Sequence, residues 1–164
     1  MVPNAFTLMN LLLGILSLTY TMSGSFTLAA IAILLSAALD RVDGNLARRL
    51  GVSSDFGKEL DSLADLVSFG VAPAILAYAA VLNPPLGVWG LVIAILFAAC
   101  GAIRLARFNI LNIGDHFLGV PITIAGGLIA AAMLIANRLP FWAMAFVMVS
   151  LSALMVSKIR IPKM

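Results

Sequence analysis

Acidic residues are concentrated in one short stretch of this chain, between positions 40 and 65. Six of the seven acidic residues lie there, although the chain as a whole is 63% hydrophobic and only 10% charged. Carboxylates are costly in an apolar environment unless a cation neutralises them. The stretch therefore indicates a cation-binding site, and the spacing of its residues predicts which carboxylates share it.

Four of these carboxylates fall on two helical faces. Asp40 and Asp43 are three residues apart, and Asp61 and Asp65 are four apart, so each pair lies on one side of a helix. Two antiparallel helices joined by a short loop would bring the pairs together. Carboxylate oxygens are hard ligands that suit Mg²⁺, Mn²⁺ or Ca²⁺, and four negative charges would balance two divalent ions.

Small residues accompany the carboxylates and leave room for a bulky ligand. Gly44 and Ala47 share the face of Asp40, and Gly57 stands on the second helix. The alternative, solvated helix ends paired with nearby basic residues, explains one Asp better than four.

The composition predicts an all-α integral membrane protein. A hydrophobic share of 63% in 164 residues is more than a water-soluble domain of this size can bury. Apolar runs predict six transmembrane helices in a single domain covering residues 1–164, and the chain's start does not resemble a cleavable signal peptide. The expected helices cover residues 4–22, 26–50, 57–82, 86–110 and 118–137, and a sixth ends near Ser157. The segment Asn83-Pro84-Pro85 is expected to end the third.

The basic residues predict the orientation of this bundle. Nine of the ten Lys and Arg residues fall on one side of a six-span arrangement, and only Arg138 falls on the other. Basic residues favour the cytoplasmic side, so both termini and the carboxylates are expected to face the cytosol from a multi-pass position in the cell membrane. The net charge of +3 then reports topology, and no nucleic-acid partner is expected.

The pattern Asp-x2-Asp-Gly-x2-Ala-Arg-x8-Gly-x3-Asp-x3-Asp, from Asp40 to Asp65, resembles the signature of the CDP-alcohol phosphotransferases, with every position filled. Enzymes of this family displace CMP from a CDP-linked alcohol with a second alcohol. The resemblance implies their six-helix fold, a homodimer and two divalent ions, Mg²⁺ or Mn²⁺. The implied metal ligands are Asp40, Asp43, Asp61 and Asp65, with Asp65 also the general base. The implied CDP-lipid pocket includes Gly44, Ala47, Arg48 and Gly57.

Further segments are similar to the phosphatidylserine synthase branch of that family. They cover residues 3–11, 61–73, 104–109 and 117–121. This similarity implies a CDP-linked lipid donor and L-serine as acceptor. It also suggests that Ser54 contacts a phosphate. Asn4, Thr7 and Asn10 would line the nucleotide pocket from the first helix, or else form interhelical hydrogen bonds.

Arg104 and Arg107 offer a physical reason for serine. They are three residues apart near the cytoplasmic end of the fourth helix, and arginine binds carboxylates in a bidentate manner. The alternative is that both anchor the helix at the membrane surface or contact lipid headgroups.

The acceptor and the functional class have alternatives. Glycerol phosphate or an inositol compound would use the same chemistry as serine. A cation transporter would require inverted repeats and ligands near the midplane, neither of which is found. A structural membrane subunit would need no carboxylate constellation. The sequence leaves open whether the donor carries acyl or isoprenoid chains, and whether Mg²⁺ or Mn²⁺ is preferred.

Overall fold

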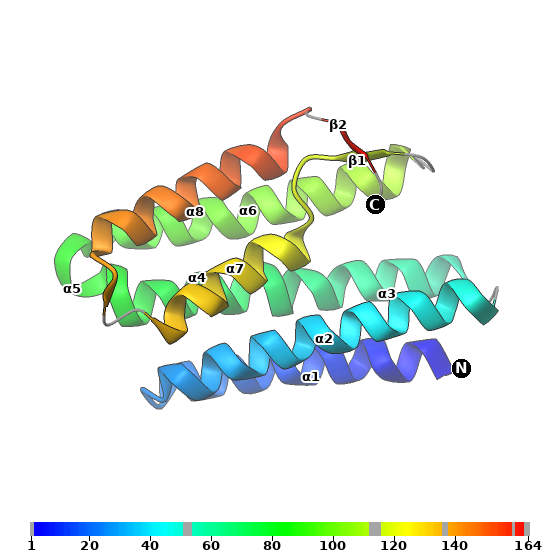
Figure 1. Cartoon of the computed structure of the whole chain (residues 1–164), viewed down its shortest axis with the longest axis horizontal. Coiled ribbons are helices and arrows are strands. Elements are labelled where there is room, and N and C mark those ends of the chain that lie inside the picture. Colours follow the sequence, from blue (N-terminus) through cyan, green and yellow to red (C-terminus); the bar gives the residue numbers. More distant parts are fainter. Residues whose placement is uncertain (1, 51–53, 112–115, 136–137, 159, 163–164) are drawn as a thin grey trace.

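The computed structural model describes residues 2–50, 54–111, 116–135, 138–158 and 160–162, and these form a bundle of helices (Figure 1). α1 (Val2–Met22) and α2 (Phe26–Leu50) form a helical hairpin. A third, continuous helical segment comprises α3 (Asp55–Asp65), η1 (Leu66–Val71), α4 (Ala72–Ala77), η2 (Tyr78–Leu82) and α5 (Asn83–Leu86). The bundle is completed by α6 (Val88–Leu111), α7 (Ile122–Leu134) and α8 (Phe141–Val156). The expected six helical segments are therefore present.

A small antiparallel sheet was not expected from the sequence. β1 (His116–Leu118) pairs with β2 (Arg160–Pro162), and His116 lies opposite Pro162. The sheet lies at the end of the bundle where α1 begins (Figure 1). Both ends of the described chain therefore lie at the same end of the bundle, as an even number of helices requires.

The prolines at 84 and 85 do not end the third helix, so that expectation is wrong. The helix continues to Leu86, and the chain turns at Gly87, whose φ is +50°. The π-helical turn η1 lies immediately before α4 with its Pro73, and η2 lies immediately before α5 with Pro84 and Pro85. Proline lacks an N–H and crowds the carbonyl four residues earlier. A locally widened helix can accommodate that loss and continue.

α7 is shorter than the expected 118–137. Residues 116–118 form β1, and α7 begins only at Ile122, after Pro121. The chain turns at Gly119, whose φ is +74°. A Cβ at Gly119 would lie 2.6 Å from the carbonyl oxygen of Met155, so this turn packs directly on the end of α8. The strand and this close contact delay the start of the helix.

The core and the outer surface are both apolar. Phe69, Phe97 and Met148 are fully buried between the helices. Many large apolar side chains nevertheless point outward, such as Ile95 on α6 and Phe146 on α8, which are 60% and 72% exposed. Three described helical stretches are long and apolar enough to cross a membrane, namely Asn4–Met22, Asp55–Leu86 and Val88–Ile110. α7 and α8 are shorter apolar helices. These features indicate an integral membrane protein.

Gly126 and Gly127 are neighbours on α7 with opposite surroundings. A Cβ at Gly126 would lie 2.7 Å from Cα of Phe69 in η1, whereas a Cβ at Gly127 would meet nothing within 4 Å. We expect Gly126→Ala to lower the free energy of unfolding by about 1–3 kcal/mol, because α7 must move away from η1. Gly127→Ala is the matched control and should be neutral or slightly stabilising. Thermal unfolding in detergent measures both, and equal losses would contradict this packing.

Candidate metal centre

Three of the four predicted carboxylates meet in the structure. Asp40 of α2 and Asp61 and Asp65 of α3 each offer an oxygen, and these oxygens lie within 4.8 Å of one another. Asp65 is buried, and the other two are half-buried. Asp43 is on α2, but its side chain lies outside the described residues, so its part in the cluster stays a prediction.

The carboxylate cluster, Asp40, Asp61 and Asp65, could hold a metal ion. Like charges held this close repel one another, and a cation between them offsets that repulsion. The ligand atoms are carboxylate oxygens, the donors preferred by Mg²⁺ and Mn²⁺. The arrangement therefore fits a hard divalent cation.

α1 and α7 connect the two helices that carry the cluster. α1 packs along α2 and also contacts α3 and η1, while α7 packs along α2. Each contributes a hydrogen bond to one carboxylate. Asn10 Nδ2 of α1 donates to Asp65 Oδ1 at 3.1 Å, and Thr123 Oγ1 of α7 donates to Asp40 Oδ2 at 3.3 Å. The carboxylates are thus oriented by elements outside their own helices.

Thr123 was not expected from the sequence, although a signal for it was present. Thr123 is in the first turn of α7, two residues after the segment 117–121, which resembles a family motif. For Asn10, the predicted interhelical hydrogen bond is present. Asn10 is 2% exposed, and its place in the nucleotide pocket stays a prediction.

The structure describes the side chains of most of the predicted CDP-lipid residues, but not those of all of them. Gly44 is exposed, and a Cβ there would meet nothing within 4 Å, so this face of α2 has the expected space. Asn4 lies beside Gly57, since a Cβ at Gly57 would be 3.4 Å from Asn4 Oδ1. Thr7 is buried on α1. The side chains of Ala47 and Arg48 lie outside the described residues.

Ser54 has a structural role at the start of α3. Its hydroxyl accepts a hydrogen bond from the backbone N–H of Gly57 at 3.0 Å, which caps the helix. This bond fixes the first turn of the helix that carries Asp61 and Asp65. Contact of Ser54 with a phosphate stays a prediction.

The two predicted serine-binding arginines occupy different environments. Arg104 is only 8% exposed, its charge acts on Asp65, and its guanidinium lies 5.9 Å from the centre of the Phe108 ring. Within the described structure its Nε has no hydrogen-bond acceptor. Arg107 instead donates from its terminal nitrogen to the carbonyl of Val156, the last residue of α8, at 2.9 Å. Of the two arginines, Arg104 is the one whose charge is seen to interact with Asp65, and serine binding by either arginine stays a prediction.

A polar contact fixes α6 relative to α3. Asn109 Nδ2 donates to Ser62 Oγ at 3.0 Å and to Glu59 Oε1 at 3.2 Å. Ser62 is adjacent to Asp61, and Asn109 is on the same helix as Arg104. The contact helps to hold Arg104 near the carboxylates.

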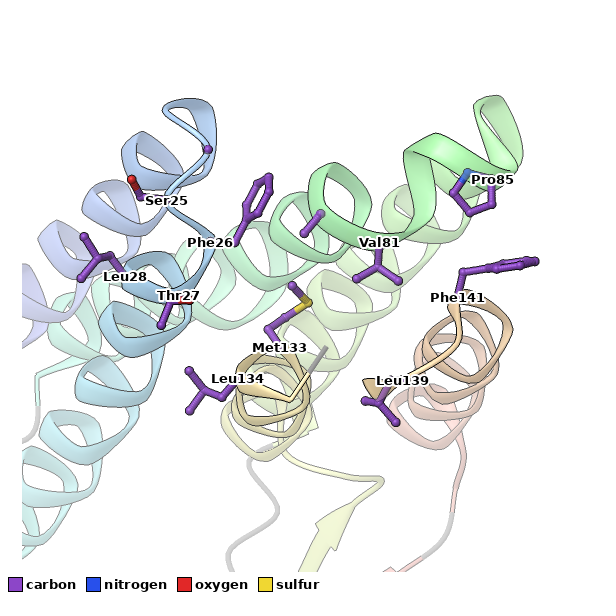
Figure 2. A pocket seen from close by; sticks show the side chains of 12 residues that line it. Ser25, Phe26, Thr27, Leu28, Val81, Pro85, Met133, Leu134, Leu139 and Phe141 are labelled. Carbon is purple, nitrogen blue, oxygen red and sulfur yellow. The ribbon is translucent and has the colours of Figure 1, made fainter. Parts of the chain in front are cut away.

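A cavity of about 670 Å³ lies near the α1–α2 and α7–α8 connections, and Figure 2 shows the residues that line it. It is lined by the start of α2 at Phe26, by Val81 of η2, and by Met133 and Phe141 near the α7–α8 connection. It shares no residue with the carboxylate cluster, so it is not part of the candidate metal centre.

Residues 1–156 match the family model described as CDP-alcohol phosphatidyltransferase. This chain belongs to that family, which confirms the family whose signature the pattern from Asp40 to Asp65 resembles.

Named relatives of this chain occur in bacteria and archaea. It is 41% identical to the CDP-diacylglycerol–serine O-phosphatidyltransferase of Helicobacter pylori, over 98% of this chain and 71% of the relative. It is 38% identical to the protein of the same name from Bacillus subtilis, over 98% of this chain and 89% of the relative. It is also 38% identical to the archaetidylserine synthase of Methanothermobacter thermautotrophicus, over 98% and 69%.

Proposed function

We propose that this protein transfers a phosphatidyl or archaetidyl group from a CDP-linked lipid to the hydroxyl of L-serine and releases CMP. The observation that carries the proposal is the carboxylate cluster beside the buried Arg104. The chain around it is 38–41% identical to the serine transferases named above over nearly its whole length. The product would be phosphatidylserine or its ether-lipid equivalent.

Asp40, Asp61 and Asp65, together with Asp43, would hold two divalent ions, Mg²⁺ or Mn²⁺. When bound, such ions supply positive charge to the pyrophosphate of the donor and to the developing charge of the leaving group. Thr123 donates a hydrogen bond to Asp40 at 3.3 Å, and Asn10 donates one to Asp65 at 3.1 Å.

In the proposed reaction, Asp65 takes the proton from the serine hydroxyl. The serine oxygen forms a bond to the phosphorus next to the lipid. The bond from that phosphorus to the bridging oxygen breaks, and CMP leaves with the electron pair. The CDP-lipid would lie against Gly44 and Gly57, with Arg48 at a phosphate and Asn4, Thr7, Ala47 and Ser54 around the nucleotide.

The proposed position in the membrane has six crossings, with the carboxylate cluster and both termini in the cytosol. Nine of ten basic residues favour this orientation. Both ends of the described chain lie at one end of the bundle (Figure 1). The donor's lipid chains would then lie in the bilayer and its nucleotide in the cytosol. A single domain covering residues 1–164 and a homodimer belong to the same proposal.

An acceptor comparison tests the function. Purified protein in detergent receives one CDP-lipid, Mg²⁺ or Mn²⁺, and L-serine, glycerol 3-phosphate or an inositol compound in separate reactions. We expect CMP release and a new lipid with serine only. Turnover with another acceptor would reassign the substrate, and no CMP release with any acceptor would refute the enzymatic interpretation.

Arg104 is the residue proposed to bind the serine carboxylate. We expect Arg104→Ala to raise the KM for serine about ten- to a hundredfold, because a charge-assisted bidentate contact is lost. The KM for CDP-lipid should change far less. Arg107→Ala should instead lower the melting temperature, because the contact with Val156 is lost. An equal rise of both KM values in Arg104→Ala would contradict the carboxylate-binding role.

A further inference from the structure

Asn10 joins three helices at the carboxylate cluster. Asn10 is on α1, and its hydrogen-bond partners are Ser36 on α2, Asp65 on α3 and Ser68 on η1. Nδ2 of Asn10 donates to Asp65 Oδ1, and Oδ1 of Asn10 accepts a hydrogen bond from the Ser36 hydroxyl. The residue is buried, so water does not compete for these bonds.

The sequence separations from Asn10 are 26 residues to Ser36, 55 to Asp65 and 58 to Ser68.

The neighbours of Asn10 determine which end of its amide faces Asp65. A carboxylate accepts hydrogen bonds and, when ionised, donates none, so it requires the NH₂ group. The Ser36 hydroxyl donates to the amide oxygen and thereby favours the same orientation. Asn10 is the only hydrogen-bond donor to Asp65 among the described residues.

The backbone of Asn10 is held as firmly as its side chain. Its carbonyl accepts a hydrogen bond from Ser68 Oγ at 2.9 Å, and Ser36 Oγ, which donates its hydrogen to Asn10 Oδ1, lies 3.3 Å from that carbonyl. One turn further along α1, a Cβ at Gly14 would lie 2.9 Å from Cα of Ser68. α1 and η1 are therefore in close contact, which leaves Asn10 little freedom to move relative to Asp65.

We propose that Asn10 is a positioning residue for the Asp65 carboxylate and that Ser36 sets the orientation of its amide. By holding Oδ1 of Asp65, Asn10 would fix how that carboxylate faces Asp40 and Asp61. The catalytic consequence rests on the proposed function, whereas the effect on metal binding does not. Residues that orient metal ligands typically change metal affinity or activity about ten- to a hundredfold when removed.

Ser17 supplies a matched control on the same helix. It is buried on α1, and its hydroxyl donates to the carbonyl of Ala29 on α2 at 2.9 Å. It contributes the same kind of interhelical bond but makes no contact with the carboxylate cluster. Ser17→Ala therefore reports the effect of losing a buried α1–α2 hydrogen bond alone.

The experiment compares Asn10→Ala, Ser36→Ala and Ser17→Ala in detergent. Mn²⁺ binding is measured by electron paramagnetic resonance without substrates, and kcat and KM by CMP release. We expect Asn10→Ala to lower Mn²⁺ affinity and kcat about ten- to a hundredfold, with KM for CDP-lipid nearly unchanged. Ser36→Ala should show a smaller loss of the same kind, and Ser36→Thr, which keeps the hydroxyl, should restore it. Ser17→Ala should change neither quantity.

Wild-type Mn²⁺ affinity and kcat in a folded Asn10→Ala variant would overturn the proposal. Losses in Ser17→Ala as large as those in Asn10→Ala would also overturn it, because they would indicate helix packing as the cause. If Asn10→Ala does not fold, Ser36→Ala and Ser36→Thr decide the question. If the wild-type protein binds Mn²⁺ but releases no CMP, the proposed function fails and Mn²⁺ affinity alone decides the role of Asn10.

Discussion

Asp65→Asn is expected to lower CMP release about a hundred- to ten-thousandfold, the usual contribution of a general base. Asparagine has nearly the same shape as aspartate, but it cannot take the proton from the serine hydroxyl. The substitution also removes one negative charge from the carboxylate cluster, and this loss should weaken metal binding. The protein should stay folded, because replacing a buried carboxylate with a neutral amide removes the cost of burying that charge. CMP release and thermal unfolding measure the two effects separately.

Asp55→Asn is the matched control for this substitution. Asp55 is also on α3, but its exposed carboxylate lies 3.7 Å from the Lys58 amine and outside the cluster. Exposed ion pairs contribute little to stability, so this variant should keep both turnover and melting temperature. Normal turnover in Asp65→Asn would refute the role of Asp65 as the base.

Removal of divalent ions is expected to abolish turnover, and Mg²⁺ or Mn²⁺ should restore it. The oxygens of Asp40, Asp61 and Asp65 lie within 4.8 Å of one another, so the chelated protein also carries unrelieved repulsion. An ion present at about 100 times its dissociation constant should therefore add about 2.7 kcal/mol to the free energy of unfolding. Thermal unfolding with EDTA and with Mn²⁺, alongside CMP release, measures both effects.

The variant Asp61→Asn distinguishes binding of the ion at the carboxylate cluster from effects of the ion elsewhere on the protein. With EDTA present this variant should melt no lower than the wild type, because one of the repelling charges is gone. Mn²⁺ should raise its melting temperature less than that of the wild type, and turnover should stay low. Full turnover of the wild type in EDTA, or an equal Mn²⁺ effect on both proteins, would refute the metal centre.

The family could be predicted because the pattern from Asp40 to Asp65 resembles a known signature, and the pairing of the carboxylates because it depends on local geometry. Residues three or four apart share a helical face wherever the helix lies, so Asp61 and Asp65 could be paired before the fold was known. The apolar runs likewise predicted six helical segments. The boundaries were less predictable, because π-helical turns before Pro73 and Pro84 let the third helix continue.

Contacts between distant parts of the chain were decided only by the tertiary structure. Asn10 is 55 residues from Asp65 and Thr123 is 83 residues from Asp40, and no local pattern connects such pairs. Arg104 and Arg107 are the same residue type on one helix, so sequence alone treated them alike. The end of α8 accepts a hydrogen bond from Arg107, whereas Arg104 is buried near Asp65. Which arginine reaches the carboxylate cluster depends on how neighbouring helices pack, and spacing along one helix does not contain that information.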